Sequence, residues 1–214
     1  MADAASLAIG PCAPLWLSFV EEVNARGLSV LEIGARASVF GTDGPRSRFV
    51  GASEYVGLDI NPGPGADLVG DVHALSGLLA GKRFGAIHST SVMEHLAMPW
   101  VAAVEMIKSL EVGGIMFHHV PFAWPEHEAV DCWRMTRQAY SVLFPRAFGM
   151  EIEAVGADHP LHMHMEKPPP EQEHFHEATA YAYFGAVMRK VEDVDFSAFR
   201  WPLDAGDALA GQRY

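Results

Sequence analysis

The sequence predicts an α/β fold, a single domain built on a mostly parallel, seven-stranded sheet with helices on both faces. Between residues 28 and 120, short apolar runs alternate with longer amphipathic ones, which is the pattern of βαβ units that feed a parallel sheet. The chain has 214 residues, of which 50% are hydrophobic. This length supports one substantial core and is short for two ordinary domains.

The elements can be assigned in order along the chain. A first helix is expected over residues 14–26, because Leu15, Phe19 and Val23 recur at a spacing of four and Gly27 ends the pattern. Further helices are expected near residues 72–80, 100–110 and 136–144, the second of them followed by Gly113 and Gly114. Strands are expected over residues 28–33, 55–60, 66–69, 84–89, 115–120, 150–155 and 178–189.

Composition narrows the function classes. Lys and Arg total 15 against 27 Asp and Glu, and the formal net charge of −12 argues against a nucleic acid or an anionic membrane as partner. The N-terminal residues lack a basic leader, and no apolar run is long enough to cross a bilayer, so we expect a soluble, cytoplasmic protein. Cys12 and Cys132 stand in no ligand-like spacing and are expected to be reduced thiols. The oligomeric state is left open.

Candidate binding residues follow the first strands. Glu32 lies near the carboxyl end of a mostly apolar strand, and Gly34 stands where the chain must turn sharply and let a ligand approach its backbone. Asp59, followed by Ile60, ends the next strand, where open α/β folds place the carboxylate that binds ribose hydroxyls. The carboxylate of Asp71 and the adjacent amide of Val72 could read an adenine edge. With Ser89 at the end of strand 84–89, these strand ends predict one nucleoside-binding pocket.

The order and spacing of these motifs resemble the class I S-adenosylmethionine-dependent methyltransferases. The matching segments are residues 30–34, 55–59, 67–71, 84–96 and 112–122, about half of the chain. The sequence looks most similar to a bacterial branch that has four motifs: a Gly-Pro-Gly after the second-strand Asp, an Asp-x-His after strand three, a Glu-His at the start of the helix after strand four, and an Asp-x-Trp-Arg-x-Thr after strand five. The corresponding segments here are Gly63-Pro64-Gly65, Asp71-Val72-His73, Glu94-His95 and Asp131-Cys132-Trp133-Arg134-Met135-Thr136.

The resemblance implies one Rossmann-like methyltransferase domain over residues 1–214, with the cofactor motifs in residues 28–122 and a substrate loop and lid in residues 121–177. It implies S-adenosylmethionine as the cofactor and a small-molecule acceptor, such as a sugar or another hydroxylated or amino metabolite. One position departs from the family pattern. Arg36 replaces the second glycine of the usual Gly-x-Gly, so the loop must avoid a positive φ there or pass farther from the methionine moiety.

Methyl transfer to a hydroxyl needs a general base, and His119 is the first candidate, with His127 and Asp131 as alternatives. Strand alternation places His118 and His119 on opposite faces, so only one of them is expected to face the pocket. Asp131 and Arg134 form either a plain salt bridge or a contact to substrate. Glu94 and His95 open a helix, where the carboxylate serves either as a cap or in catalysis.

The histidine pairs 162/164 and 174/176 have no matching Cys or carboxylate spacing, so they are interpreted as part of a polar lid, and no metal site is expected. Two other functions stay open. A nicotinamide-dependent oxidoreductase shares the strand-end carboxylate, but residues 34–39 lack its GxGxxG. A non-catalytic nucleoside-binding protein would keep the pocket, and the replacement of the second glycine by Arg36 is compatible with it.

Overall fold

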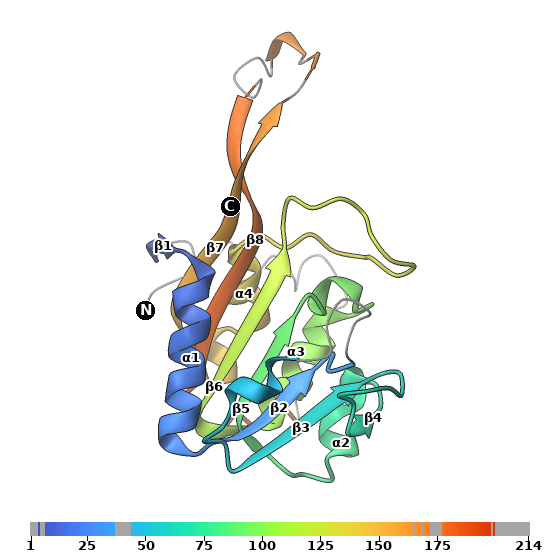
Figure 1. Cartoon of the computed structure of the whole chain (residues 1–214), viewed down its shortest axis with the longest axis vertical. Helices are drawn as coiled ribbons and strands as arrows, with labels where there is room; N and C mark the ends of the chain where they lie inside the picture. Colours follow the sequence, from blue (N-terminus) through green and yellow to red (C-terminus); the bar gives the residue numbers. More distant parts are fainter. Residues whose placement is uncertain are drawn as a thin grey trace.

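The computed structural model describes residues 4, 7–36, 44–164, 166–167, 169–171, 177–197 and 199. These residues form one sheet of eight strands in the order β1-β7-β8-β6-β5-β2-β3-β4 (Figure 1). In chain order the strands are β1 (Ile9–Gly10), β2 (Ser29–Ile33), β3 (Glu54–Asp59), β4 (Leu68–Val69), β5 (Phe84–Thr90), β6 (Leu110–Pro121), β7 (Met150–His164) and β8 (Glu177–Lys190). The α/β class is confirmed.

The prediction of seven strands was wrong, and the sheet is mixed. Strands β2 to β6 are mutually parallel, whereas β8 runs antiparallel to both β6 and β7. The additional strand, β1, is two residues long and pairs in parallel with β7. Two residues are too few to show the alternation by which a strand is recognised in sequence.

Helices cover both faces of the sheet, as predicted. The helix α1 (Cys12–Arg26) lies on one face, where Phe19 and Val23 pack with Val30 of β2. On the other face lie α2 (Leu75–Leu78), α3 (Pro99–Lys108) and α4 (Gln138–Leu143), which pack with the next residue of β2, Leu31. No helix among the described residues is long and apolar enough to cross a membrane.

Short 3₁₀ turns complete the connections: η1 (Pro45–Arg48), η2 (Val72–Ala74), η3 (Met93–His95) and η4 (Arg146–Phe148). The helix expected over residues 72–80 is divided into η2 and the single turn of α2. The division falls at Ala74, whose backbone is not helical (φ −122°, ψ 22°), while the Asp71 carboxylate caps the 3₁₀ turn by accepting a hydrogen bond from the His73 amide at 2.9 Å.

The strands β7 and β8 are longer than the sequence predicts. Their pairing continues to His164 opposite Glu177, far past the end of β6, so that they form a two-stranded arm that projects from the body (Figure 1). The arm leaves the body at the carboxyl edge of the parallel strands. His162 and Met163 lie on it, whereas residues 174 and 176 lie outside the described residues.

The N-terminal end of α1 lies very close to β7 at Gly156. A Cβ atom at this position would come within 2.9 Å of the Leu15 side chain and 3.0 Å of the Cys12 backbone. Gly156 pairs with Gly10 of β1, where an added Cβ would meet no atom within 4 Å. The approach at Gly156 lets the Cys12 amide reach the carboxylate of Asp158, at 3.0 Å.

We therefore predict that Gly156→Ala lowers the free energy of unfolding by about 1–3 kcal/mol, because the methyl group separates α1 from the sheet. The paired control, Gly10→Ala, places the same methyl group in open space and should change stability by less than about 0.5 kcal/mol. Urea denaturation of the two variants and the wild type measures the difference. Equal stabilities for the two variants would contradict this account of the contact.

Candidate active site

The turn after β2 is built for close approach. Gly34 has a φ of +79°, and its amide and that of Ala35 donate to the carbonyl of Leu58 in the neighbouring strand at 2.8 and 3.0 Å. The Asp59 carboxylate, at the end of β3, accepts hydrogen bonds from the amides of Arg36 (3.1 Å) and Asn61 (2.9 Å). Arg36, which stands in place of the second glycine, does not have a positive φ. The loop therefore avoids the backbone conformation that would require a glycine there.

The Gly-Pro-Gly segment explains where the Arg36 side chain goes. A Cβ on Gly63 would lie 2.8 Å from Cγ of Arg36, so the arginine stem lies along this turn. Gly65 then passes over β3 so closely that a Cβ on Gly57 would come within 2.1 Å of the Gly65 carbonyl oxygen. The absence of a side chain at Gly57 and at Gly63 allows this close packing, which lies beside the end of β3 that carries Asp59.

The remaining predicted nucleoside-binding residues lie at neighbouring strand ends. Ile60 is 65% exposed, an apolar surface directly after Asp59. The Asp71 carboxylate contacts both the amide and Nδ1 of His73, the latter at 2.6 Å, while Val72 is buried. The Ser89 side chain points into the core instead, where its hydroxyl hydrogen-bonds Nδ1 of the buried His118 at 2.7 Å.

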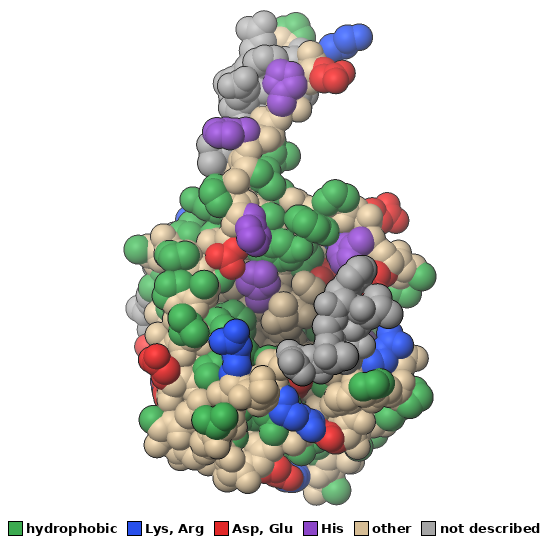
Figure 2. Space-filling view, in the orientation of Figure 1, with side chains coloured by type: hydrophobic (Ala, Val, Ile, Leu, Met, Phe, Trp, Pro, Cys, Tyr) green, Lys and Arg blue, Asp and Glu red, His purple; other side chains and the backbone are tan. Residues whose placement is uncertain are grey.

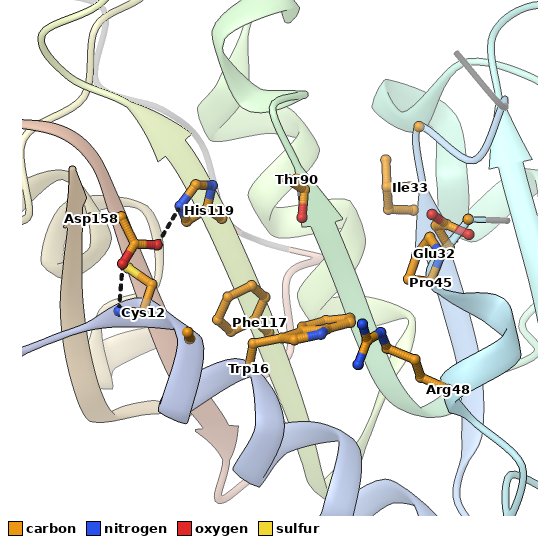
Figure 3. Close-up of a pocket in the computed structure, with 13 residues that line it drawn as sticks. Cys12, Trp16, Glu32, Ile33, Pro45, Arg48, Thr90, Phe117, His119 and Asp158 are labelled. Atoms are coloured by element: carbon orange, nitrogen blue, oxygen red, sulfur yellow. Dashed lines mark hydrogen bonds and ion pairs between the residues drawn. The ribbon is translucent and has the colours of Figure 1, made fainter. Parts of the chain in front are cut away.

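A pocket of about 450 Å³ opens at the carboxyl ends of β2, β5 and β6 (Figure 3). Its walls combine the rings of Trp16 and Phe117 with the charged side chains of Glu32, Arg48 and Asp158. Figure 2 shows the hollowed face in which histidine side chains gather below the arm. The full lining is Cys12, Ala13, Trp16, Glu32, Ile33, Gly34, Gly44, Pro45, Arg48, Thr90, Phe117, His119 and Asp158.

Glu32 belongs to a buried hydrogen-bond chain beside this pocket. The Tyr55 hydroxyl donates to Glu32 Oε2 at 2.6 Å and lies 2.9 Å from Nε2 of His88. Because a phenol has one proton, His88 must donate to the Tyr55 oxygen. Burial raises the pKa of Glu32, and the hydrogen bond from Tyr55 opposes this shift. The hydrogen bond from Tyr55 therefore fixes the orientation of the Glu32 carboxylate at the pocket wall.

His119 faces the pocket and His118 does not, as strand alternation predicts. Nε2 of His119 lies 3.4 Å from Asp158 Oδ2, and its ring stacks on Tyr183 with centroids 4.9 Å apart. Burial lowers the pKa of His119, and Asp158 opposes the shift, so the imidazole is neutral at neutral pH. Burial and the nearby Asp158 raise the pKa of the Cys12 thiol to about 12, which keeps the sulfur protonated.

His127 and Asp131 lie in the segment that follows β6, outside the pocket lining. The Asp131 side chain is 1% exposed and binds the Arg134 guanidinium through both oxygens, at 2.5 and 2.6 Å. It also accepts the His127 amide at 2.8 Å and lies 3.1 Å from His127 Nδ1. Hydrogen bonds from Arg134 hold the pKa of Asp131 far below its usual range. Of the two alternatives for this pair, the salt bridge is present.

Of the ten predicted site residues, the structure brings Glu32, Gly34 and His119 together in the pocket lining, and the other seven lie outside this lining. Sequence reasoning missed Trp16, Arg48 and Asp158. Trp16 faces the pocket only because α1 crosses β6, and Asp158 only because β7 extends past the sheet. No local pattern in the sequence marks either position.

Comparisons with known proteins bear on the fold of this chain. No protein-family model and no curated protein matches the sequence. Solved structures do match: an S-adenosylmethionine-dependent methyltransferase from Mesorhizobium loti superposes with a TM-score of 0.55 at 16% identity, covering 83% of this chain and 97% of that one. The chain therefore shares its Rossmann-like α/β fold with this methyltransferase.

Two other structures show how widely this fold is used. A proposed sarcosine dimethylglycine methyltransferase from Galdieria sulphuraria has a TM-score of 0.56 at 13% identity, covering 85% of this chain and 84% of that one. The [4+2]-cyclase SpnF has a TM-score of 0.51 at 14% identity, covering 83% of this chain and 81% of that one. The shared fold therefore does not by itself fix the reaction.

The buried histidines lead to a prediction about acid stability. Burial lowers the pKa values of His88 and His118 to about 3, compared with about 6.5 in an unfolded chain. The unfolded state therefore binds more protons between these values, and stability is lost as pH falls from about 6.5 toward 3. Each histidine contributes a slope of up to about 1.4 kcal/mol per pH unit.

Urea denaturation between pH 7 and pH 4 measures this loss, and histidine ring NMR shifts in the folded protein should show both side chains neutral at pH 5. Protonation of either ring near pH 6.5 without unfolding would contradict the assignment.

Proposed function

We propose that this protein transfers a methyl group from S-adenosylmethionine to a small hydroxylated or amino metabolite. The observation that supports it most directly is the conjunction of Gly34 in a left-handed turn, Asp59 at the next strand end and a pocket in front of both β2 and β6. In open α/β sheets this edge binds ligands. The fold shared with methyltransferases is consistent with the proposal.

The charges and surfaces around the pocket suit this cofactor. Asp59 keeps lone pairs for ribose hydroxyls beyond the two backbone amides it accepts, and the exposed Ile60 offers an apolar surface for adenine. The pocket walls carry a carboxylate, Glu32, and a guanidinium, Arg48, which match the ammonium and carboxylate groups of the methionine moiety.

The reaction requires an in-line approach of the acceptor to the methyl group, so positioning and exclusion of water supply much of the acceleration. His119 lines the pocket with Nε2 toward Asp158, so Nδ1, which is buried and has no hydrogen-bond partner among the described residues, is the nitrogen that takes the proton of an acceptor hydroxyl or amine. Asp131, bound to Arg134 through both oxygens, is better suited to hold His127 than to accept a proton. The arm of β7 and β8 rises from this edge of the sheet (Figure 1), and we propose that it forms part of the lid over the acceptor.

Cofactor binding is tested by calorimetric titration with S-adenosylmethionine, S-adenosylhomocysteine and NAD. We expect micromolar binding of the two sulfur nucleosides and none of NAD. Asp59→Asn should weaken binding at least about tenfold, or 1.4 kcal/mol. The control Asp193→Asn changes a carboxylate that pairs with Arg83 and Lys190, away from the pocket, and should leave affinity unchanged. Binding of NAD alone, or of none of the three, would overturn the proposal.

The role of His119 is tested on an acceptor identified by screening hydroxylated and amino metabolites. We expect His119→Gln to lower kcat by about 10²–10⁴-fold while the Kd for S-adenosylmethionine stays unchanged. In the wild type, kcat/KM should rise with pH along a limb whose pKa lies below about 6.5, because burial favours the neutral imidazole.

The matched variant for this test is Asp158→Asn, which removes the carboxylate that raises the pKa of His119. The limb should then move to lower pH, whereas in His119→Gln it should disappear. A limb that persists in His119→Gln would assign the base to another residue.

A further inference from the structure

A second cluster of polar side chains lies at the same edge of the sheet, outside the pocket lining. It consists of Glu94 and His95, in η3 after β5, and His127, in the segment after β6. One ligand atom from each of the three side chains lies within 4.8 Å of the other two. The Glu94 carbonyl accepts hydrogen bonds from the amides of Cys132 (2.8 Å) and Trp133 (3.2 Å), which fastens the two segments together.

Glu94 is the unusual member of this cluster. Its side chain is 0% exposed, and neither carboxylate oxygen accepts a hydrogen bond from another described residue. A capping role at the start of a helix, one of the two interpretations of the sequence, does not account for it, because a cap would engage these oxygens. A buried carboxylate without a hydrogen-bond partner is neutralised either by a proton, which burial favours by raising the pKa of Glu94, or by a bound cation. The two imidazoles within reach of Glu94 favour the cation.

The two histidines are oriented for metal binding. Nδ1 of His95 donates to the Val130 carbonyl at 2.5 Å, which leaves its Nε2 with a lone pair, 3.7 Å from Glu94 Oε1. Nδ1 of His127 lies 3.1 Å from the Asp131 carboxylate, so Nε2 is the ring nitrogen that is available to a ligand. A carboxylate or carbonyl behind each imidazole is the arrangement that fixes histidine ligands of metals.

We infer that Glu94, His95 and His127 form a binding site for a divalent transition-metal ion, with Asp131 as the carboxylate that orients His127. Two imidazoles and one carboxylate favour Zn²⁺ or a similar ion over Mg²⁺ or Ca²⁺, which prefer oxygen ligands. Ligand atoms of tetrahedral zinc are about 3.4 Å apart at the usual bond lengths, so only small side-chain movements are needed. Three protein ligands leave one position for a water, hydroxyl or carboxylate oxygen.

A second group of possible ligands, Cys12, His119 and Asp158, is less suited to a metal. Both oxygens of Asp158 already have partners, one in the Cys12 amide and one in His119. The thiol remains protonated at neutral pH, whereas metals bind the thiolate. The inference thus departs from the sequence-based expectation of no metal, and it does not depend on the proposed methyl transfer.

The test is titration of the untagged, metal-free protein with Zn²⁺ by calorimetry, in the presence of excess Mg²⁺. We expect one high-affinity ion per chain, and at least about 100-fold weaker binding in Glu94→Gln and in His127→Gln. Two controls address other sites. The double variant His162→Gln with His164→Gln removes two histidines of the arm, and Cys12→Ser removes the thiol; both should bind Zn²⁺ as the wild type does.

Thermal unfolding keeps the inference testable if a variant is perturbed. Zn²⁺ should raise the Tm of the wild type and not that of Glu94→Gln, while metal-free Glu94→Gln should be at least as stable as the metal-free wild type, because it removes a buried unpaired charge. In the wild type, bound Co²⁺ should show the visible absorption of a nitrogen- and oxygen-ligated site. No tight Zn²⁺ binding by the wild type, or binding retained in Glu94→Gln and His127→Gln, would overturn the inference.

Discussion

Asp158 ties together three elements that are far apart in the sequence. One of its oxygens accepts the Cys12 amide at the beginning of α1, and the other lies 3.4 Å from His119 at the end of β6. This geometry is possible because Gly156 lets the helix lie directly on β7. One wall of the pocket, the orientation of Trp16 and the position of His119 all depend on this contact (Figure 3).

Buried polar side chains of the sheet are hydrogen-bonded or ion-paired to one another. These partners determine which side chains remain available to a ligand in the pocket. His88 is bonded to Tyr55, and His118 to Ser89, so these imidazoles are structural and remain neutral. His119 and Glu32 instead reach the pocket while being held from behind, by Asp158 and Tyr55. A side chain fixed by a neighbour and open on the other side is preorganised for a ligand, which lowers the entropic cost of binding.

The sequence predicts the parallel half of the fold well for a physical reason. Strands β2 and β5 are buried on both faces, so they appear in the sequence as short apolar runs, and β2 is followed by a glycine at the ligand-binding edge. The antiparallel half is predicted only in outline. Neither the two-residue β1 nor the extension of β7 beyond the sheet is encoded by a periodic pattern, since much of the arm is exposed on both sides.

The same distinction explains which site residues can be found in the sequence. Gly34, Asp59 and Asp71 follow strands at regular spacings, so local chemistry identifies them. Arg48 and Asp158 line the pocket because of packing between segments that are far apart in the sequence. Glu94 becomes a candidate only from the structure, which shows that its carboxylate is buried and has no hydrogen-bond partner among the described residues. In sequence, Glu94 looks like the first residue of a helix. In the structure its carboxylate oxygens are buried beside the imidazoles of His95 and His127. This arrangement at the edge of the sheet, outside the pocket lining, is suited to a bound cation.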